Sequence, residues 1–268
     1  MTDRRRFLLG AGAAVLGAGA AACSDDSSGT GATTTAADRT TTSTDGTTTS
    51  SVPGGVAVLT AADFDGLGAC KLLPEQMAGP FPLQQQFDRR DITEGVPGHP
   101  MRLGLRVVDQ SCAPVAGARV EVWHADSSGD YSAFIDDGGG KDEGPGTTFL
   151  RGTQTAADDG IVEFTTIYPG WYTGRAVHVH LRVHTPDASA IVLTSQLYFD
   201  GTYTNEVFSK PPYAEFGPPD TTNEADGIAG DPPNDGTQLR TSAAETPNGR
   251  GTLALAVLGV DPAARSTA

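Results

Sequence analysis

Three of the five histidines in this 268-residue sequence lie within seven residues, at His178, His180 and His184. The odd positions from 177 to 183 are aliphatic, and the even positions from 178 to 184 are polar. Successive side chains of a β-strand point to opposite faces, so this pattern predicts a strand with one apolar face and one histidine-bearing face. His178 and His180 would then project the same way, about 7 Å apart, which suits two neighbouring ligands of one metal ion. A solvent-facing strand with a histidine-rich polar face is the alternative, and we expect His184 to be a surface histidine.

Two tyrosines follow turns and could approach the same strand. Tyr172 comes just after the turn at 169–170 and six residues before His178, and Tyr131 comes two residues after Gly129. Turns of this kind reverse the chain, so either phenol could return towards the histidines. An aromatic side chain after a turn can also simply cover the core, and the spacing alone leaves both roles open.

The elements that must position these residues are predicted to be β-strands. Apolar and polar residues alternate in 101–107, 118–122 and 162–166, and Gly or Pro interrupts the runs at short intervals. In 191–199, a further strand would place Ile191, Leu193, Leu197 and Phe199 on one face. No helical periodicity extends beyond a couple of turns. The pattern predicts an all-β fold, a β-sandwich of mostly antiparallel strands with long loops covering a metal site. The loops would include a Gly-rich one at 137–146 and a Pro/Gly/Asn/Asp segment at 211–250, either functional covers or disordered.

The first 55 residues differ in composition from the rest of the chain. Residues 1–23 have a basic head and a short Ala/Gly/Leu stretch, which indicates a secretory signal and not a membrane span. Arg4-Arg5-Arg6-Phe7-Leu8 resembles a twin-arginine export signal. Ala20-Ala21-Ala22-Cys23 resembles a lipoprotein cleavage box that lacks its usual Leu, so lipidation of Cys23 and ordinary cleavage near the alanines both stay open. Residues 24–55 are predicted to be a disordered Ser/Thr/Gly-rich tether, and 56–268 to be the folded domain.

Cysteine content agrees with an exported protein, extracellular or attached to the cell envelope, and the charge limits its partners. The formal net charge is −15 at pH 7, and removing residues 1–22 makes it more negative, because they carry three Arg and one Asp. Such acidity argues against nucleic acid or an anionic membrane as a partner. Apart from Cys23, Cys70 and Cys112 form an even pair, which predicts a disulfide in an oxidising compartment, with two buried thiols as the alternative. The oligomeric state stays open, a homodimer included.

In their order along the chain, these motifs resemble the intradiol ring-cleavage dioxygenases, the family of the catechol 1,2- and protocatechuate 3,4-dioxygenases. The resemblance covers about residues 70–215. Its matching segments are 92–99, 114–126, 129–132, 149–152, 159–160, 169–172 and 175–180. The chain departs from many relatives at Pro80-Phe81-Pro82, where they have a Gly-Pro-Tyr-Tyr run, and it has a signal and tether where intracellular relatives have a helical dimerisation segment.

The resemblance implies a non-haem iron(III) site with four protein ligands: Tyr131, Tyr172, His178 and His180. Two hard tyrosinate oxygens favour the ferric state, and a trivalent ion can displace phenol protons that ordinarily titrate near pH 10. The implied reaction uses a catecholic or phenolic substrate and O₂, and gives a muconate-type diacid. The resemblance further implies that Tyr172 accepts a substrate proton, that Arg175 stabilises negative charge on the substrate, and that Gln196 lies beside the histidines. An antiparallel pairing of even positions with even positions would bring Gln196 there.

Two other functions stay open at the level of sequence. The first is a non-catalytic transthyretin-like β-sandwich that binds a surface or polymer, because related sandwiches use a segment such as 114–123 structurally. The second is a zinc or copper enzyme with His178, His180 and His124 as ligands. We expect His124 instead to be structural or to support the ligands from behind.

Overall fold

A computed structural model describes residues 55–68, 70–133, 147–229 and 236–268. They belong to a compact unit, Ser50–Ala268. The predictions for the export signal, for the tether up to residue 54 and for the loop at 137–146 lie outside the described residues. Within the described ranges, no helix has the length and hydropathy needed to cross a membrane.

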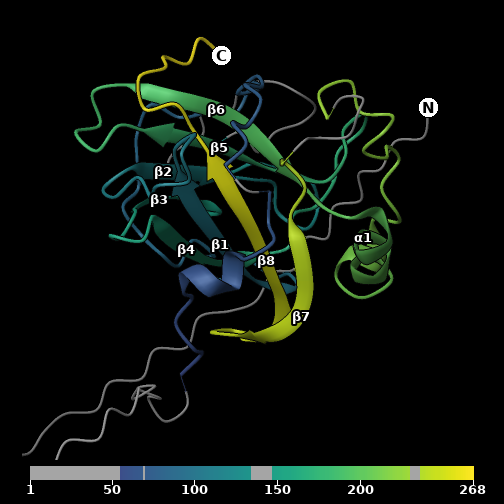
Figure 1. The fold of residues 1–268 in the computed structure, drawn as a ribbon. Helices are drawn as coiled ribbons and strands as arrows, with labels where there is room; N and C mark the ends of the chain where they lie inside the picture. Colours follow the sequence, from purple (N-terminus) through teal and green to yellow (C-terminus); the bar gives the residue numbers. More distant parts are fainter. Residues whose placement is uncertain (1–54, 69, 134–146, 230–235) are drawn as a thin grey trace, which may run out of the picture. The chain divides into compact units, whose positions relative to one another are not determined.

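Strands in the described residues form two four-stranded sheets (Figure 1). The first sheet has the order β4-β1-β8-β7, with β1 at Pro100–Val108, β4 at Ile161–Ile167, β7 at Arg240–Thr246 and β8 at Gly249–Gly259. The second has the order β3-β2-β5-β6, with β2 at Arg119–Trp123, β3 at Arg151–Thr155, β5 at His178–His184 and β6 at Ile191–Tyr198. Neighbouring strands are antiparallel except for β1 and β8, which are parallel. The predicted β-sandwich is confirmed.

The apolar faces of both sheets contribute to one core, which fixes the direction of the histidines. The core includes alternate residues of β1 and β5: Met101, Leu103, Leu105, Val107, Val179, Leu181 and Val183. Each fully buried aliphatic side chain of this kind stabilises the fold by about 1.5–3 kcal/mol. A one-residue slip of β5 would exchange these aliphatic side chains for the histidines, so the core strongly specifies the register.

The polar face of the second sheet is covered by residues 74–90. The backbone N–H of Gln76 donates to the Thr194 carbonyl at 2.9 Å, and that of Thr153 donates to the Phe87 carbonyl at 2.7 Å. This segment crosses the sheet between those two contacts. The histidine-bearing face is therefore an interior surface, and not the solvent-facing strand that was the alternative.

His184 corrects one expectation. It was expected at the surface, but it is only 6% exposed. Its Nε2 lies 3.4 Å from a Glu121 carboxylate oxygen and 3.2 Å from the Gln86 amide nitrogen. The prediction was wrong because strand alternation gives the face of a residue, whereas the covering segment comes from a distant part of the chain.

Several elements were not predicted. Strands β3, β7 and β8 were missed, and β7 lies inside the 211–250 segment that was expected to be a loop. Its pattern is mostly exposed, because an edge strand of small polar residues has no apolar face to alternate. Short helices α1 (Gly201–Phe208), η1 (Ala61–Phe64) and η2 (Tyr213–Glu215) complete the described elements.

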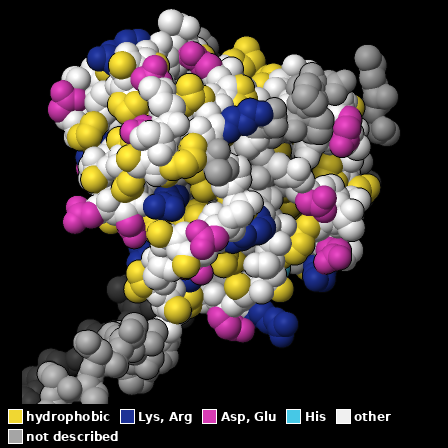
Figure 2. Space-filling view, viewed as in Figure 1, with side chains coloured by type: hydrophobic (Ala, Val, Ile, Leu, Met, Phe, Trp, Pro, Cys, Tyr) yellow, Lys and Arg dark blue, Asp and Glu magenta, His cyan; other side chains and the backbone are white. Residues whose placement is uncertain are grey.

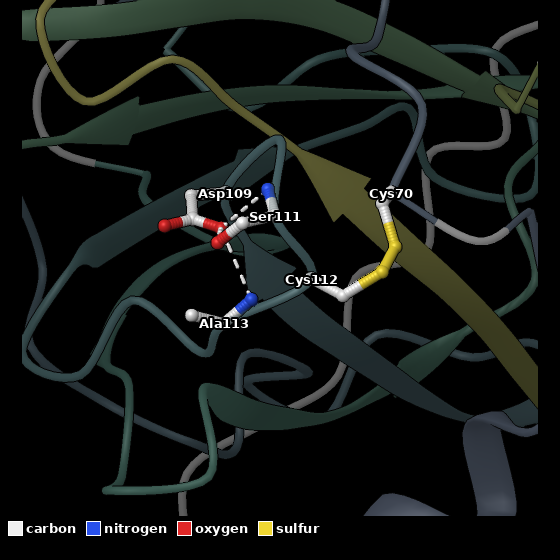
Figure 3. The surroundings of a disulfide bond; sticks show 5 residues. All are labelled: Cys70, Asp109, Ser111, Cys112 and Ala113. Atoms are coloured by element: carbon white, nitrogen blue, oxygen red, sulfur yellow. Dashed lines mark hydrogen bonds between the residues drawn. A yellow bond between two sulfur atoms is a disulfide. The ribbon is translucent and has the colours of Figure 1, made fainter.

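Cys70 and Cys112 form the expected disulfide (Figure 3). Their Cα atoms are 4.8 Å apart, within the usual range for such a bond. Asp109 shapes the turn before Cys112, because its Oδ1 accepts hydrogen bonds from the backbone N–H groups of Ser111 at 2.8 Å and Ala113 at 3.0 Å. The disulfide ties the segment before β1 to the loop that follows β1.

Charged side chains of both signs are interspersed on the face shown in Figure 2, with no gathering of one sign there. Among the described residues, Arg102 pairs with Glu163 at 2.6 Å and Arg119 pairs with Asp88 at 2.7 Å. The partly exposed Arg119–Asp88 pair contributes little to stability. The attraction within the buried Arg102–Glu163 pair is largely offset by its desolvation cost, so the core and the disulfide are the better explanation for the fold.

Candidate metal centre

Four donor side chains meet at the start of β5. His178 Nε2 lies 3.0 Å from His180 Nε2 and 3.3 Å from each of the hydroxyl oxygens of Tyr131 and Tyr172. Tyr131 and both histidines are buried, and Tyr172 is half-buried. The structure thus brings together all four side chains that the sequence analysis singled out as ligands.

The pairing of β5 with β6 gives the histidines their neighbours. His180 lies opposite Gln196, and His178 lies opposite Tyr198. Even positions therefore pair with even positions, which confirms the predicted location of Gln196 beside the histidines. Gln196 is fully buried, and its side-chain amide donates to the Met77 carbonyl of the covering segment at 2.9 Å.

Two turns that each have glycine at their point of contact bring the tyrosines together. A Cβ on Gly129, whose φ is +94°, would lie 2.3 Å from the Trp171 carbonyl oxygen. A Cβ on Gly170 would lie 2.1 Å from the Asp126 carbonyl oxygen, which accepts the Gly170 N–H at 2.9 Å. The turn before Tyr131 and the turn before Tyr172 can therefore pack against each other only because both positions are glycine.

The two imidazoles are oriented by different means. The Nδ1 of His178 is 2.6 Å from the Ala176 carbonyl, so Nδ1 carries the proton and Nε2 turns its lone pair towards the other donors. The ring of His180 stacks on Trp123, with 5.0 Å between centroids and an interplanar angle of 2°. Among the described residues, the Nδ1 of His180 has no hydrogen-bond partner. The orientation of the His180 ring therefore depends on its packing against Trp123.

Burial keeps all four donors neutral when no cation is present. Desolvation and the charge of Arg175 lower the pKa of His178 to about 3, and desolvation holds the pKa of His180 well below its ordinary value. Burial and the neighbouring Tyr172 raise the pKa of Tyr131, and burial raises the pKa of Tyr172. The result is a largely buried cluster of oxygen and nitrogen lone pairs with no positive charge among its four members.

This donor set fits a single metal ion. Two donors about 2.1 Å from one ion and at right angles to it lie about 3.0 Å apart, close to the observed separations of 3.0–3.3 Å. Imidazole nitrogen with hard phenolate oxygen suits iron, and a bound cation reverses the pKa shift of the phenols. In the described part of the chain, no three side chains drawn from His, Cys, Asp and Glu gather as a metal site, so the candidate depends on the tyrosines.

Arg175 connects the donors to a buried polar network. Its Nη1 lies 3.4 Å from the Tyr172 hydroxyl, its Nη2 donates to Gln196 Oε1 at 2.5 Å, and its Nε donates to Asp226 Oδ2 at 2.9 Å. Burial alone would raise the pKa of Asp226, but backbone N–H donors and the charge of Arg175 lower it below the usual carboxyl value. Asp226 is therefore ionised, and it holds the guanidinium beside Tyr172.

His124 is not among the donors. Its Nε2 is 2.8 Å from the Thr166 hydroxyl and its Nδ1 is 2.8 Å from the Ala125 carbonyl. Both ring nitrogens are thus engaged elsewhere, as expected for a structural residue. This geometry argues against a zinc or copper site that includes His124.

Three residues near the donors had no assigned role in the sequence analysis. Trp123 stacks on His180, and Phe81 stacks on Tyr131 with 4.2 Å between ring centroids. Phe81 belongs to the run that departs from many relatives, so an aromatic wall persists there with a different sequence. Asp226 lies in the 211–250 segment, where no local pattern distinguishes it from the other acidic residues.

Comparison with known proteins points to one family. The profile of a family described as Dioxygenase matches residues 78–210. The solved structure of an intradiol ring-cleavage dioxygenase from Tetranychus urticae is 30% identical, covers 74% of this chain and 98% of its own, and superposes with a TM-score of 0.66.

Two curated relatives are similar over shorter regions. A chlorocatechol 1,2-dioxygenase from Rhodococcus opacus is 33% identical over 124 residues, which are 39% of this chain and 45% of the relative. A catechol 1,2-dioxygenase from Acinetobacter lwoffii is 29% identical over 169 residues, which are 56% of this chain and 46% of the relative. The chain thus spans less than half the length of these two relatives.

Proposed function

This chain belongs to the intradiol ring-cleavage dioxygenase family, and on that premise we propose that it is an iron(III) enzyme. It would open catechol-type rings between the two hydroxylated carbons with O₂ and give muconate-type diacids. The observation that carries the proposal is the convergence of Tyr131, Tyr172 and His180, whose donor atoms each lie within 3.3 Å of His178 Nε2. Neither a transthyretin-like binding module nor a site including His124 explains two phenols packed against a buried histidine nitrogen.

The four donors would hold the ion, and the remaining residues would manage charge and protons. A ferric ion held there would supply the positive charge that favours ionised phenol and catechol oxygens. It would also make the bound catechol ring reactive towards O₂. Tyr172 is the half-buried member of the set, so its phenolate is the one that can accept a proton from an incoming catechol. Arg175, 3.4 Å away, would stabilise negative charge on that oxygen and on the substrate.

The surroundings would keep water away from the reacting ring. Phe81 stacks on Tyr131, and Trp123 covers one face of His180. Gln196 joins the guanidinium of Arg175 to the covering segment through Met77. In such an apolar, preorganised setting electrostatic interactions are stronger than in water.

Colour tests the proposal cheaply. A tyrosinate bound to iron(III) absorbs visible light, so the iron-loaded protein should be red, and catechol should shift the band. A colourless protein with full iron occupancy would overturn the assignment. Oxygen uptake and product mass across a panel of catechols, hydroxyquinols and plant-derived phenolics would then identify the substrate.

We also propose that the protein is exported, with Cys23 as a lipid anchor if the signal is processed as a lipoprotein. The support is the sequence of residues 1–23 and the Cys70–Cys112 disulfide, which suits an oxidising compartment. The intact mass of the mature protein tests this. A diacylglyceryl group on Cys23 would establish the anchor, cleavage near the alanines would establish release, and an unprocessed chain would contradict export.

A further inference from the structure

Asp226 touches none of the four donors, yet it contacts the chain on both sides of the Arg175–Ala176 peptide. Its Oδ2 accepts hydrogen bonds from Arg175 Nε at 2.9 Å and from the Ala176 N–H at 2.8 Å. Its Oδ1 accepts from the N–H groups of Ile228 at 2.8 Å and Ala229 at 3.1 Å. The carboxylate is fully buried, so both of its oxygens are engaged by these four N–H groups.

Each contact on Oδ2 leads to a different donor of the metal centre. Through Arg175 it leads to Tyr172, because Arg175 Nη1 lies 3.4 Å from the phenol oxygen. Through Ala176 it leads to His178, because the carbonyl of Ala176 accepts the proton of His178 Nδ1 at 2.6 Å. The N–H of Ala176 bonds to Asp226 while its C=O orients the imidazole, so one residue transmits the position of the carboxylate to a ligand.

The segment that carries Asp226 is itself held in place. The Asp226 N–H donates to the Thr222 carbonyl at 3.0 Å, and the Asn223 amide donates to the Phe199 carbonyl at the end of β6 at 2.8 Å. Ala229 packs with Ala176 and Tyr198 in a small buried cluster. Asp226 therefore projects from a turn anchored to the sheet that carries His178 and His180.

From this geometry we infer that Asp226 is a positioning residue that sets both Tyr172, through Arg175, and His178, through the Ala176 peptide. The inference rests on the proposed function and extends it to a segment about fifty residues away along the chain. Groups that orient metal ligands typically change metal affinity or activity by about 10- to 100-fold when they are altered.

The Asp226→Asn variant tests this, because it keeps the size of the side chain and removes its charge. We expect ferric affinity and kcat each to fall by about 10- to 100-fold, with a displaced visible band. Asp200→Asn is the matched control. It removes one carboxylate that caps α1 by accepting the Tyr203 N–H at 2.9 Å, and it should leave the band and kcat within about twofold of the wild type. Asp226→Asn behaving like Asp200→Asn would overturn the inference.

A double-mutant cycle separates the two routes. If Asp226 acts on the substrate through Arg175, then Arg175→Gln and Asp226→Asn will be non-additive in KM for catechol. The loss of ferric affinity by way of Ala176 should appear in Asp226→Asn and not in Arg175→Gln. Full additivity in KM would exclude the route through Arg175.

Hydrogen exchange of the iron-free protein keeps this inference distinct from the proposed function. The Ala176 N–H should exchange slowly in the wild type and much faster in Asp226→Asn, whether or not the protein binds iron. Unchanged exchange would refute the positioning role even if the enzyme is active. Absence of ferric binding by the wild type would refute the proposed function alone. Should Asp226→Asn fail to fold, rapid exchange of Ala176 in the wild type would still contradict the inference.

Discussion

The two ends of β5 carry the same alternating pattern but have become different sites. At the first end, His178 and His180 meet two phenols. At the other end, His184 meets Glu121 and Gln86. Both ends are buried under residues 74–90, so burial does not distinguish them. The difference is what the neighbouring segments deliver: tyrosines from two packed turns at one end, and a carboxylate from β2 at the other.

On β5, the strand determines which way each histidine points, and the neighbouring segments determine which groups each histidine meets. A histidine on the polar face of β5 becomes a candidate ligand only where other donors arrive without compensating charge. At the His184 end, Glu121 already provides a charge partner for the cations beside it, including Arg182 at 4.0 Å. At the first end, the four donors are neutral, so a bound metal cation would provide the positive charge at their centre.

The largest expected effect comes from removing a donor at the first end. His180→Ala should lose bound iron and the visible band, and turnover should fall by at least about a thousandfold, since the centre is no longer assembled. His184→Gln is the matched change at the other end, and it should keep iron and turnover within about twofold. Iron content and oxygen uptake measure both. Equal losses in the two variants would erase the distinction between the ends.

Tyr172→Phe should have the next largest effect. The fold and bound iron should remain, because Tyr172 is the half-buried member of the set, whereas His180 is one of the three buried donors that enclose the ion. Loss of the proton acceptor should lower turnover by about a hundredfold or more, and the catechol-induced band shift should largely disappear. Stopped-flow absorbance and oxygen uptake measure the two effects. Turnover at the wild-type rate would remove Tyr172 from the site.

Gly129→Ala tests whether the turns deliver the tyrosines. The new Cβ would lie 2.3 Å from the Trp171 carbonyl in a conformation that disfavours side chains. We expect the free energy of unfolding to fall by about 1–3 kcal/mol, with weaker ferric binding because Tyr131 and Tyr172 move apart. Gly174→Ala is a useful control, since it has a similar positive φ and no atom within 4 Å of its Cβ. If both variants weaken ferric binding equally, the packing of the two turns is not the cause.

The smallest effect concerns His124, the buried histidine outside the donor set. Burial lowers its pKa to about 4, whereas an unfolded chain has a value of about 6.5. Between these values the unfolded state binds a proton that the folded state does not, so stability falls as pH falls from about 6.5 to about 4. The slope is at most about 1.4 kcal/mol per pH unit for one group. Denaturant unfolding of iron-free wild type and His124→Gln measures it, and an equally steep slope in the variant would contradict this cause.

Much of the fold was predictable because strand alternation is a local property. Apolar residues two apart must share a face, and burying that face determines where His178 and His180 point. The same logic predicted that Gln196 lies beside the histidines, and the structure pairs it with His180. It could not find β7, because an exposed edge strand of small polar residues has no alternation to detect.

The sequence by itself therefore determined the histidine strand and its register, and the resemblance in motif order pointed to the two tyrosines. Only the tertiary structure decided that His184 is buried, that Trp123 and Phe81 form the aromatic wall, and that Asp226 holds Arg175 and Ala176. The Asp226–Ala176 contact joins residues 50 positions apart, and the Gln196–Met77 contact joins residues 119 positions apart. Such contacts arise when the core brings distant segments together, and no periodicity along the chain encodes them.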